Sequence, residues 1–306
     1  NSLVLGGPTA GPITVGAPIA PGSITHFALQ SGADILVNFS LAGPNSLTLN
    51  AGANVHQLAA SALIAASLNV LVGQVGEDGG TNIFLGSIAA TIVNVTGNEE
   101  SDTLNGTGAD DTLNGGAGVD TMSGGGGNDT YVVDNFGDII VEAGASGNDT
   151  AQSTAASYTL GANVERLLLL GTADIDGTGN SLENRIVGNS GHNELRGGSA
   201  VDHISGGDGD DLVDGQSGHD LLEGGAGNDT LLGGSHGIDR LDGGTGADTM
   251  TGGVDNDTYV VDNAGDVVIE VSGQGNDTVE SGITFTLPAH VERLELSGAS
   301  HIDGFG

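Results

Sequence analysis

Aspartate recurs at a spacing of nine residues in two stretches of the sequence, each time two residues before an apolar side chain. The nine-residue units run from Gly97 to Val132 and from Gly188 to Val260. Their sixth residue is Asp in every unit except at Asn193, and one extra residue displaces Asp239 by one position. Carboxylates that recur in a fixed phase can act together as oxygen ligands. The pattern therefore indicates binding of hard cations.

The elements that must position these carboxylates follow from the same repeat. Each unit is interpreted as a Gly-rich turn followed by a three-residue strand with one inward side chain. Two units form one turn of a flattened helix, and successive turns stack as parallel strands about 4.8 Å apart. The expected inward columns are Leu104 with Met122, Leu113 with Tyr131, Val213 with Leu231 and Met250, and Ile204 with Leu222, Leu241 and Tyr259. The predicted fold is mainly β, a parallel β-roll built of nonapeptide repeats.

The stacking also predicts columns of carboxylates along both edges of the roll. One set comprises Asp102 over Asp120, Asp111 over Asp129, and Asp211 over Asp229 and Asp248; the opposite edge of the second stretch carries Asp202, Asp220, Asp239 and Asp257. Carboxylates at one strand spacing repel each other unless a cation lies between them. Ca²⁺ accepts six to eight oxygens in irregular geometry, whereas Mg²⁺ requires a tight octahedron and Zn²⁺ prefers nitrogen or sulfur. Several Ca²⁺ ions are the predicted cofactors.

Five units match the pattern GGxGxDxUx, those that start at Gly115, Gly124, Gly206, Gly224 and Gly243. In this pattern the sequence resembles the RTX (repeats-in-toxin) haemolysin-type family of calcium-binding repeat proteins. The resemblance covers residues 97–132 and 188–260, with spacers at 133–187 and 261–306. It implies a calcium β-roll that folds after export through a type I secretion channel.

The resemblance also implies the calcium ligands, which are the second, fourth and sixth residues of one unit with the first, third and sixth of the unit two further on. The implied sets are Gly207, Gly209 and Asp211 with Gly224, Ala226 and Asp229; Gly225, Gly227 and Asp229 with Gly243, Thr245 and Asp248; and Thr107, Ala109 and Asp111 with Gly124, Gly126 and Asp129. Gly116 and Gly118 join Asp120, and Gly218 joins Asp220. Three departures weaken particular sites: Asn193, the insertion around His236, and the loss of turn glycines in the unit at Gly97.

Composition narrows the classes of function. The chain has 57 Gly, no Cys, no Trp, and 40 acidic residues against five basic ones, which gives a formal charge of -35. The absence of Cys excludes disulfides, zinc–thiolate sites and Cys nucleophiles within these residues. The acidic surface repels phosphate backbones and anionic lipid, so neither nucleic-acid binding nor electrostatic membrane docking is expected. No apolar run is long enough for a transmembrane segment.

The first 95 residues differ from the rest because Asp34, Glu77 and Asp78 are their only charged residues. Strands are expected at 34–39, 46–49, 69–75, 82–85 and 88–95, and a helix over Val55–Ser67 with Asn54 as its cap. Three regions are predicted: residues 1–96, a β-rich N-terminal capping module with one short helix; 97–187, the first repeat block plus spacer; and 188–306, the second block plus a truncated spacer. The chain is expected to be a piece of a larger protein.

These features predict a non-catalytic, calcium-binding structural region of a secreted or surface-displayed bacterial protein, such as an adhesin, an S-layer or a matrix or filament component. The alternatives are the accessory calcium-binding region of a secreted protease, lipase or polysaccharide-modifying enzyme, or a carbohydrate-binding module. The string 233–237 satisfies the GxSxG pattern of hydrolases but lies inside a repeat, without the strand and helix that such a site requires. The expected partner is calcium; self-association and a cell-surface or glycan partner both stay open.

Overall fold

In the computed structural model, every regular element is a β-strand in the part of the chain that the structure describes. This part comprises the backbone of the strands within residues 2–96 and, with side chains, residues 96–97, 101–144, 147–297 and 303–304. The chain divides into two compact units, Asn1–Gln152 and Ser153–Gly306. Within the described residues there is no helix with the length and hydrophobicity needed to cross a lipid bilayer.

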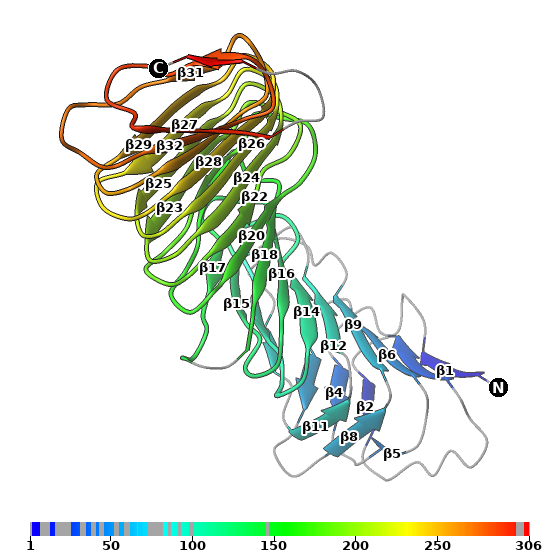
Figure 1. Cartoon of the computed structure of the whole chain (residues 1–306). Helices are drawn as coiled ribbons and strands as arrows, with labels where there is room; N and C mark the ends of the chain where they lie inside the picture. The colour runs from blue at the N-terminus through cyan, green and yellow to red at the C-terminus, as the bar shows by residue number, and fades with distance from the viewer. Residues whose placement is uncertain are drawn as a thin grey trace. The chain divides into compact units, whose positions relative to one another are not determined.

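The first unit is a solenoid of parallel strands (Figure 1). One sheet runs in the order β1 (Ser2–Gly6), β3 (His26–Gln30), β6 (Ser46–Ala51), β9 (Ser67–Val72), β12 (Val93–Thr96), β14 (Asp111–Asn114), β16 (Thr130–Val133) and β18 (Thr150–Ser153). A second contains β2 (Ile13–Val15), β4 (Ile35–Val37), β7 (Val55–Gln57), β10 (Asn82–Phe84), β13 (Thr103–Asn105), β15 (Thr121–Ser123) and β17 (Ile139–Ile140). A third, shorter sheet contains β5 (Leu41–Ala42), β8 (Ala62–Ala65) and β11 (Ser87–Ala90).

The second unit is a two-sheet solenoid in which alternate strands join opposite sheets. One sheet contains β19 (Ser157–Thr159), β21 (Asp176–Thr178), β23 (Glu194–Ser199), β25 (Leu212–Ser217), β27 (Thr230–Gly234), β29 (Thr249–Gly253) and β31 (Val267–Val268). The other contains β20 (Arg166–Leu169), β22 (Arg185–Val187), β24 (His203–Asp208), β26 (Leu221–Ala226), β28 (Arg240–Thr245), β30 (Thr258–Val261), β32 (Thr278–Ser281) and β34 (Arg293–Leu296). A short pair, β33 (Phe285–Thr286) with β35 (Gly304–Phe305), lies near the C-terminus.

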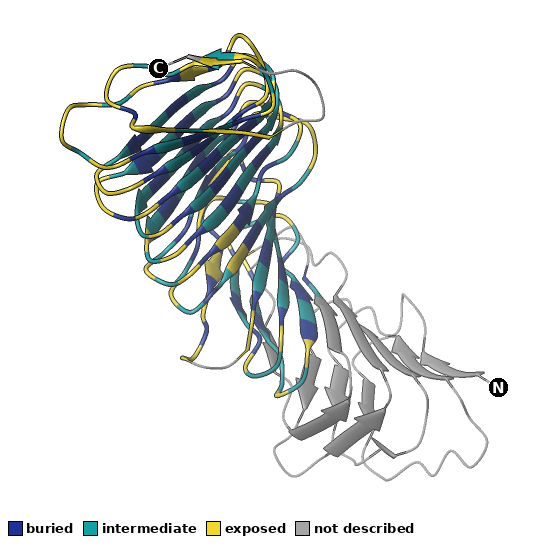
Figure 2. Cartoon of the chain, in the orientation of Figure 1, coloured by how far each residue is buried: buried dark blue, intermediate teal, exposed yellow. Residues whose placement is uncertain are grey.

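The register confirms the predicted inward columns. Leu104 pairs with Met122 and Leu113 with Tyr131 in the first unit. In the second unit the pairs run through Ile204, Leu222, Leu241 and Tyr259 on one sheet and through Val213, Leu231 and Met250 on the other. Each of these side chains has an exposed fraction of 0%. Buried and partly exposed residues alternate along the strands (Figure 2), as expected for a narrow core between two sheets.

The helix expected over Val55–Ser67 is wrong, because β7, β8 and the start of β9 occupy that range. Val55 pairs with Ile35 and Ile83, and Leu63 pairs with Leu41 and Ile88. Parallel neighbours on both sides supply backbone hydrogen bonds that override the helical preference of an Ala- and Leu-rich segment. The expected cap Asn54 lies outside the described residues. The strands expected at 34–39, 46–49, 69–75 and 82–85 are present with shifted ends, whereas the range 88–95 holds two strands, β11 and β12, which belong to different sheets.

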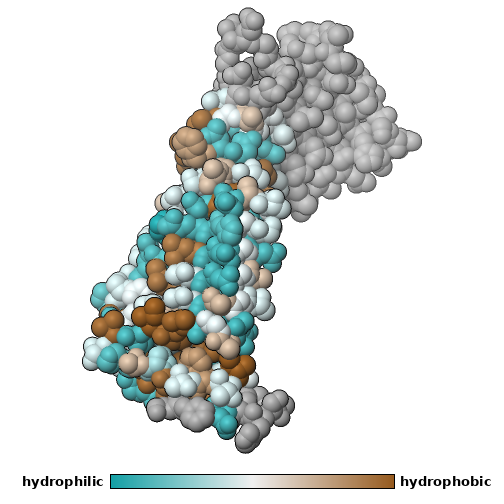
Figure 3. Space-filling view, turned by 90° about the horizontal axis from the view of Figure 1, so that it is seen from above, coloured by the Kyte–Doolittle hydropathy of each residue, from teal (hydrophilic) through white to brown (hydrophobic). Residues whose placement is uncertain are grey.

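The surface of the described residues is mixed in polarity. Hydrophilic residues cover much of the face drawn in Figure 3, and separate hydrophobic patches interrupt them. Exposed large apolar side chains occur at equivalent positions of the two units, Ile139 and Val141 in the first and Val267 and Ile269 in the second. These residues lie in or beside β17 and β31, the strands that end their respective sheets.

Candidate calcium-binding edges

The sixth-place aspartates are buried in the turns along both edges of the solenoid, and one oxygen of each has the same role. Asp211 Oδ1 accepts the backbone N–H of Asn193 at 2.7 Å, and Asp229 Oδ1 accepts that of Asp211 at 2.8 Å. The same bond joins Asp102 to Asp120, Asp111 to Asp129, Asp202 to Asp220, Asp220 to Asp239, Asp229 to Asp248 and Asp239 to Asp257. This ladder of bonds links each turn to the one stacked on it and fixes the register of the edge.

The second oxygen, Oδ2, distinguishes two kinds of turn. Within the repeat blocks, nine sixth-place aspartates have an Oδ2 that is buried and without a hydrogen-bond partner in the described structure: Asp120, Asp129, Asp202, Asp211, Asp220, Asp229, Asp239, Asp248 and Asp257. The exposed fraction of these residues is at most 3%. A buried carboxylate oxygen without a donor is costly, because it has lost its water and gained nothing in exchange. We call these turns open.

The backbone conformation at the second place accounts for the open turns. In the nine open turns, the φ angle of the second-place residue lies between 74° (Gln216) and 130° (Gly234). The second-place N–H then points away from the sixth-place aspartate of its own turn. The N–H of Gln216 donates instead to Asp214 Oδ1 at 3.1 Å, and the N–H of Gly244 donates to Asp242 Oδ1 at 3.2 Å. Glycine adopts a positive φ without strain, which explains its frequency at this place. Gln216 shows that the φ angle, and not glycine itself, leaves Oδ2 free.

Other turns satisfy the sixth-place side chain internally, and we call them closed. The N–H and the hydroxyl of Thr107 both donate to Asp111 Oδ2, at 2.6 and 3.0 Å. The N–H groups of Asp134 and Asn135 donate to Asp138 Oδ2, and those of Asp262 and Asn263 donate to Asp266 Oδ2. None of these second-place residues has a positive φ. A closed turn therefore has no oxygen that requires a cation.

Burial changes the acidity of the open-turn aspartates. Desolvation is the largest cause, and it raises the pKa of Asp120, Asp129, Asp220 and Asp257 from 3.8 to about 7. It raises the pKa of Asp202, Asp211, Asp229, Asp239 and Asp248 to about 6. The ladder bond from the preceding turn opposes the shift by stabilising the carboxylate. A cation beside these oxygens would restore the ionised form.

First-place glycines complete an oxygen-lined space in the open turns of Asp211 and Asp229. A Cβ atom added at Gly206 would clash with Asp211 Oδ2 and with the carbonyl oxygen of Gly224, two units further on. The equivalent oxygens converge at Gly224, where they are Asp229 Oδ2 and the carbonyl oxygen of Gly243. All donors at these points are carboxylate or carbonyl oxygens, the set that Ca²⁺ prefers. The residues present therefore fit Ca²⁺.

The structure divides the implied ligand sets into those that belong to open turns and those that belong to closed turns. The turns of Asp211 and Asp229 are open, with Gly207, Gly209, Gly225 and Gly227 all at positive φ. The third-place carbonyls of Ala226 and Thr245 each accept one backbone N–H, from Gly209 and Gly227. Gly116 and Gly118 also have positive φ before Asp120.

At the other implied positions, one turn is closed and the edge is continuous across the insertion. The set of Thr107, Ala109 and Asp111 belongs to a closed turn, so Asp111 Oδ2 is already bonded. Gly126 donates its N–H to the carbonyl of Thr107, and Gly218 donates to that of His236. The extra residue around His236 does not interrupt the ladder, because Asp239 Oδ1 still accepts the N–H of Asp220 at 2.7 Å. The turn between β27 and β28 absorbs the insertion.

Two asparagines show how an edge is satisfied without a cation. Asn193 Nδ2 donates to the carbonyl of Ile175 at 2.7 Å, and Asn184 Nδ2 donates to that of Val164 at 3.2 Å. The amide oxygens accept N–H groups of their own turns, from Asn189 and Asn180. A neutral amide thus provides both the acceptor and a donor toward the carbonyls of the preceding turn. Asn184 was missed in the sequence, although it lies 18 residues before Asp202.

The ladder also continues into the spacers, which the sequence analysis did not predict. Asp138 and Asp266 accept the N–H groups of Asp120 and Asp248, each from 18 residues away, and Asp149 and Asp277 accept those of Asp129 and Asp257 from 20 residues away. Extending the spacing of 18 beyond the glycine-rich blocks would have identified Asp138 and Asp266. At Asp149 and Asp277 the GNDT segments of the spacers left a partial site and a plain turn equally open, because their spacing of 20 falls outside the repeat.

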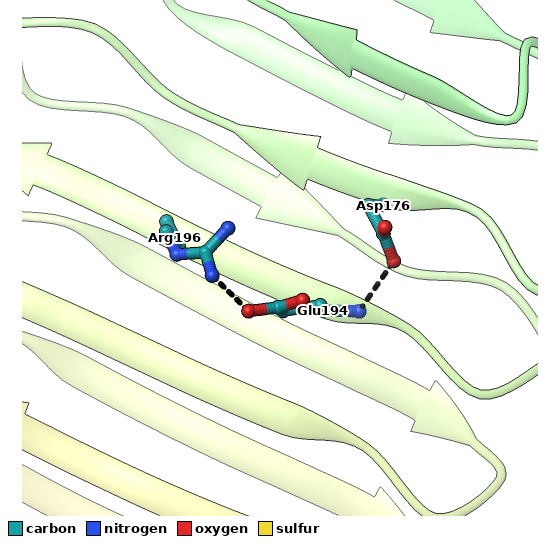
Figure 4. A network of polar contacts seen from close by, with 3 residues as sticks. All are labelled: Asp176, Glu194 and Arg196. Atoms are coloured by element: carbon teal, nitrogen blue, oxygen red, sulfur yellow. Dashed lines mark hydrogen bonds and ion pairs between the residues drawn. The ribbon is translucent and has the colours of Figure 1, made fainter.

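Three of the five arginines pair with glutamates on strands, away from the turns. Arg196 contacts Glu194 on β23, whose N–H donates to Asp176 Oδ1 on β21 at 3.1 Å (Figure 4). Arg240 pairs with Glu280 at 2.9 Å, and Arg293 contacts Glu295. These side chains are roughly half exposed and lie on strands rather than in the turns. These three cationic side chains are thus engaged away from the open turns.

Comparison with known families agrees with this geometry. The RTX calcium-binding nonapeptide repeat matches the chain in four copies, at residues 96–131, 178–213, 205–235 and 234–268. No curated protein shows significant similarity to the chain. The matched residues contain all nine open turns. The repeat blocks of this chain therefore belong to the RTX family of calcium-binding nonapeptide repeats, and they form a parallel β-roll that binds several Ca²⁺ ions.

Proposed function

We propose that this chain is a non-catalytic structural region of a secreted or surface-displayed bacterial protein, such as an adhesin, an S-layer or a matrix component, and that it folds on binding Ca²⁺ after export. One observation carries the proposal: the nine buried Oδ2 atoms that have no partner in the described residues. Without cations these groups oppose folding, and with cations they stabilise the same turns.

The energetic coupling follows from mass action. A ligand that binds only the folded state adds about 2.7 kcal/mol per site when its concentration is 100 times its dissociation constant. Several such sites outweigh the small net stability of a domain, which is about 5–15 kcal/mol. The formal charge of -35 acts in the same direction, because it favours an expanded chain until cations neutralise it.

The coupling of folding to Ca²⁺ binding suits a protein that is exported. Free Ca²⁺ is scarce in the bacterial cytosol and abundant outside the cell, so the chain would stay unfolded before secretion and become rigid afterwards. The structure of the repeat supports a scaffold because each turn contacts only its neighbours, and a scaffold of this kind can be extended by duplication. The segment 128–150 indeed returns, with few changes, at 256–278.

A non-catalytic role is supported by the one string that has a hydrolase-like pattern. Ser235 and His236 lie next to each other on an exposed turn after β27, with Ser235 Oγ 3.1 Å from His236 Nδ1. The turn leads into β28 and not into a helix. A nucleophile elbow requires a strand-to-helix turn that exposes the serine above an oxyanion hole.

The test is a Ca²⁺ titration followed by far-UV circular dichroism, with Mg²⁺ as the control cation. We expect a cooperative gain of β signal with Ca²⁺ and little change with Mg²⁺, which requires a tighter octahedron. A β-rich spectrum in chelator that Ca²⁺ leaves unchanged would refute the coupling. Light scattering on the same samples tests self-association, for which the exposed Ile139, Val141, Val267 and Ile269 provide apolar surface.

A further inference from the structure

Each unit contains a cluster of three carboxylates where a glycine-rich block meets its spacer. In the first unit these are Asp129, Glu142 and Asp149, all buried, and each offers one oxygen within 4.8 Å of the others. Asp257, Glu270 and Asp277 form the equivalent cluster in the second unit, again within 4.8 Å. Glu142, Asp149, Glu270 and Asp277 lie outside the residues matched by the RTX repeat. Neither cluster was predicted from the sequence.

The glutamate enters the cluster because the repeat spacing changes there. Asp149 follows Asp129 by 20 residues, whereas aspartates within the blocks are stacked at 18. Glu142 lies 18 residues after Gly124 and accepts its N–H at 3.2 Å. It therefore stands at the first place of its turn, where the blocks have glycine. A third carboxylate thus appears where the ordinary edge offers a first-place carbonyl.

A buried tyrosine orients each glutamate. The hydroxyl of Tyr131 accepts the N–H of Gly124 at 2.7 Å and donates to Glu142 Oε1. The hydroxyl of Tyr259 has the same two partners, the N–H of Gly252 at 2.7 Å and Glu270 Oε1. Both tyrosines have an exposed fraction of 0%. The glutamate side chain is therefore held in place and is not free to turn into solvent.

The cluster includes an oxygen that points to a ligand. Asp129 Oδ1 accepts the N–H of Asp111, but Oδ2 is buried without a partner in the described structure, and Asp257 Oδ2 is in the same position. The ion pairs of the described residues lie elsewhere, at Arg196, His203, Arg240 and Arg293. Three carboxylates at this separation, all buried except the half-buried Glu270, repel one another strongly unless a cation neutralises them.

We infer that Asp129, Glu142 and Asp149 bind a Ca²⁺ ion at the end of the first repeat block, and that Asp257, Glu270 and Asp277 bind its equivalent in the second. The inference rests on the calcium-dependent folding proposed above, and it completes the open turns of Asp129 and Asp257, the last of each block, with ligands from the spacers. Because three carboxylates converge instead of two, these sites bind trivalent lanthanides more tightly than the sites of the blocks. The ions close the calcium-binding edges where the glycine-rich turns end.

Terbium luminescence provides a local test, because Tb³⁺ bound near a tyrosine is excited through the ring. The chain has three tyrosines and no tryptophan, and two of the tyrosines contact the clusters. We expect sensitised emission from the folded protein, a loss of about half of it in Glu142→Gln, and nearly complete loss in Glu142→Gln/Glu270→Gln. The number of bound Ca²⁺ ions, measured by equilibrium dialysis, should fall by two in the double variant.

Two controls make the result specific. Tyr158→Phe removes the third tyrosine, which lies on β19, and should leave the emission unchanged. Glu183→Gln removes one exposed charge and should leave both the emission and the Ca²⁺ count unchanged. If the double Gln variant does not fold in Ca²⁺, the variant Glu142→Asp/Glu270→Asp is measured in its place. It keeps both charges, but the shorter side chains move the carboxylate oxygens away from the ion, and Tb³⁺ binding should weaken at least tenfold.

The outcomes separate the two proposals. A double variant that folds in Ca²⁺ with unchanged emission and an unchanged ion count overturns the inference but leaves the proposed function intact. A wild-type chain that shows no Ca²⁺-dependent folding overturns the proposed function first. Wild-type folding with two fewer ions in the double variant supports both.

Discussion

Replacing Gly207 by alanine tests whether the second-place φ angle creates an ion-binding turn. Gly207 has a φ of 111°, and a Cβ atom at this position would clash with the carbonyl oxygen of Asn189. Alanine can avoid this clash only if the turn changes to the closed form seen at Thr107. The N–H of residue 207 would then donate to Asp211 Oδ2, which is without a partner in the described structure.

The expected magnitude has two parts. An L-residue with its Cβ in a left-handed conformation costs about 1–2 kcal/mol. If the turn closes instead, the ion between Asp211 and Asp229 is lost, which removes about 2.7 kcal/mol at a Ca²⁺ concentration of 100 times the dissociation constant. The free energy of unfolding should therefore fall by about 1–3 kcal/mol, and closure of the turn should also lower the number of bound Ca²⁺ ions by one.

Urea unfolding at fixed millimolar Ca²⁺ measures the first quantity, and equilibrium dialysis measures the second. The matched control is Gly108→Ala, because Gly108 has no positive φ and an added Cβ meets no atom within 4 Å. That control should change the free energy of unfolding by less than about 0.5 kcal/mol. A Gly207→Ala chain with the full ion count and the stability of the control would show that the φ angle does not decide ion binding.

Three further predictions follow from the same turns. Gln216→Gly should stabilise the chain by about 1 kcal/mol in urea unfolding, because Gln216 holds a φ of 74° that glycine adopts without strain; a loss of stability would contradict this. Asn193→Asp should destabilise the chain by about 2–3 kcal/mol at limiting Ca²⁺, because the donor to the Ile175 carbonyl is lost and a charge is buried. This loss of stability should shrink as the Ca²⁺ concentration rises. A loss that is independent of Ca²⁺ in thermal unfolding would exclude an ion at that turn. In calcium-free buffer, folding should be favoured by acid. The pKa values of the nine open-turn aspartates are raised from 3.8 to about 6 or 7, so their protonated forms favour the fold; that stability is complete below about pH 4 and is lost as the pH rises through 6 to 7. Circular dichroism that shows more β structure at pH 8 than at pH 4 without Ca²⁺ would contradict the sign.

The repeat itself could be predicted because its physical basis is local. A spacing of nine residues with an apolar residue at the eighth place specifies which side chain points inward, and stacking two units per turn then pairs Leu104 with Met122 and Asp211 with Asp229. The structure contains these pairs in the expected register. The choice of Ca²⁺ followed from the oxygen-only donor set in the same way.

The segment Val55–Ser67 could not be predicted, because its preference and its environment disagree. Alanine and leucine at helical spacing favour a helix in isolation. The neighbouring turns present strands on both sides, and Leu63 pairs with Leu41 and Ile88. Backbone hydrogen bonds to two parallel neighbours decide the outcome, and those neighbours are 22 and 25 residues away in the sequence.

The sequence by itself determined the phase of the repeat, the inward columns, the two acidic edges and the kind of cation, because each depends only on residue type and spacing. Only the tertiary structure decided which carboxylates need that cation. Asp111 and Asp211 occupy the same place in their units, yet Thr107 bonds the free oxygen of one while the positive φ of Gly207 leaves the other unpaired. The cluster of Asp129, Glu142 and Asp149 likewise arises from stacking residues 20 positions apart, across an irregular spacing that no repeat pattern describes.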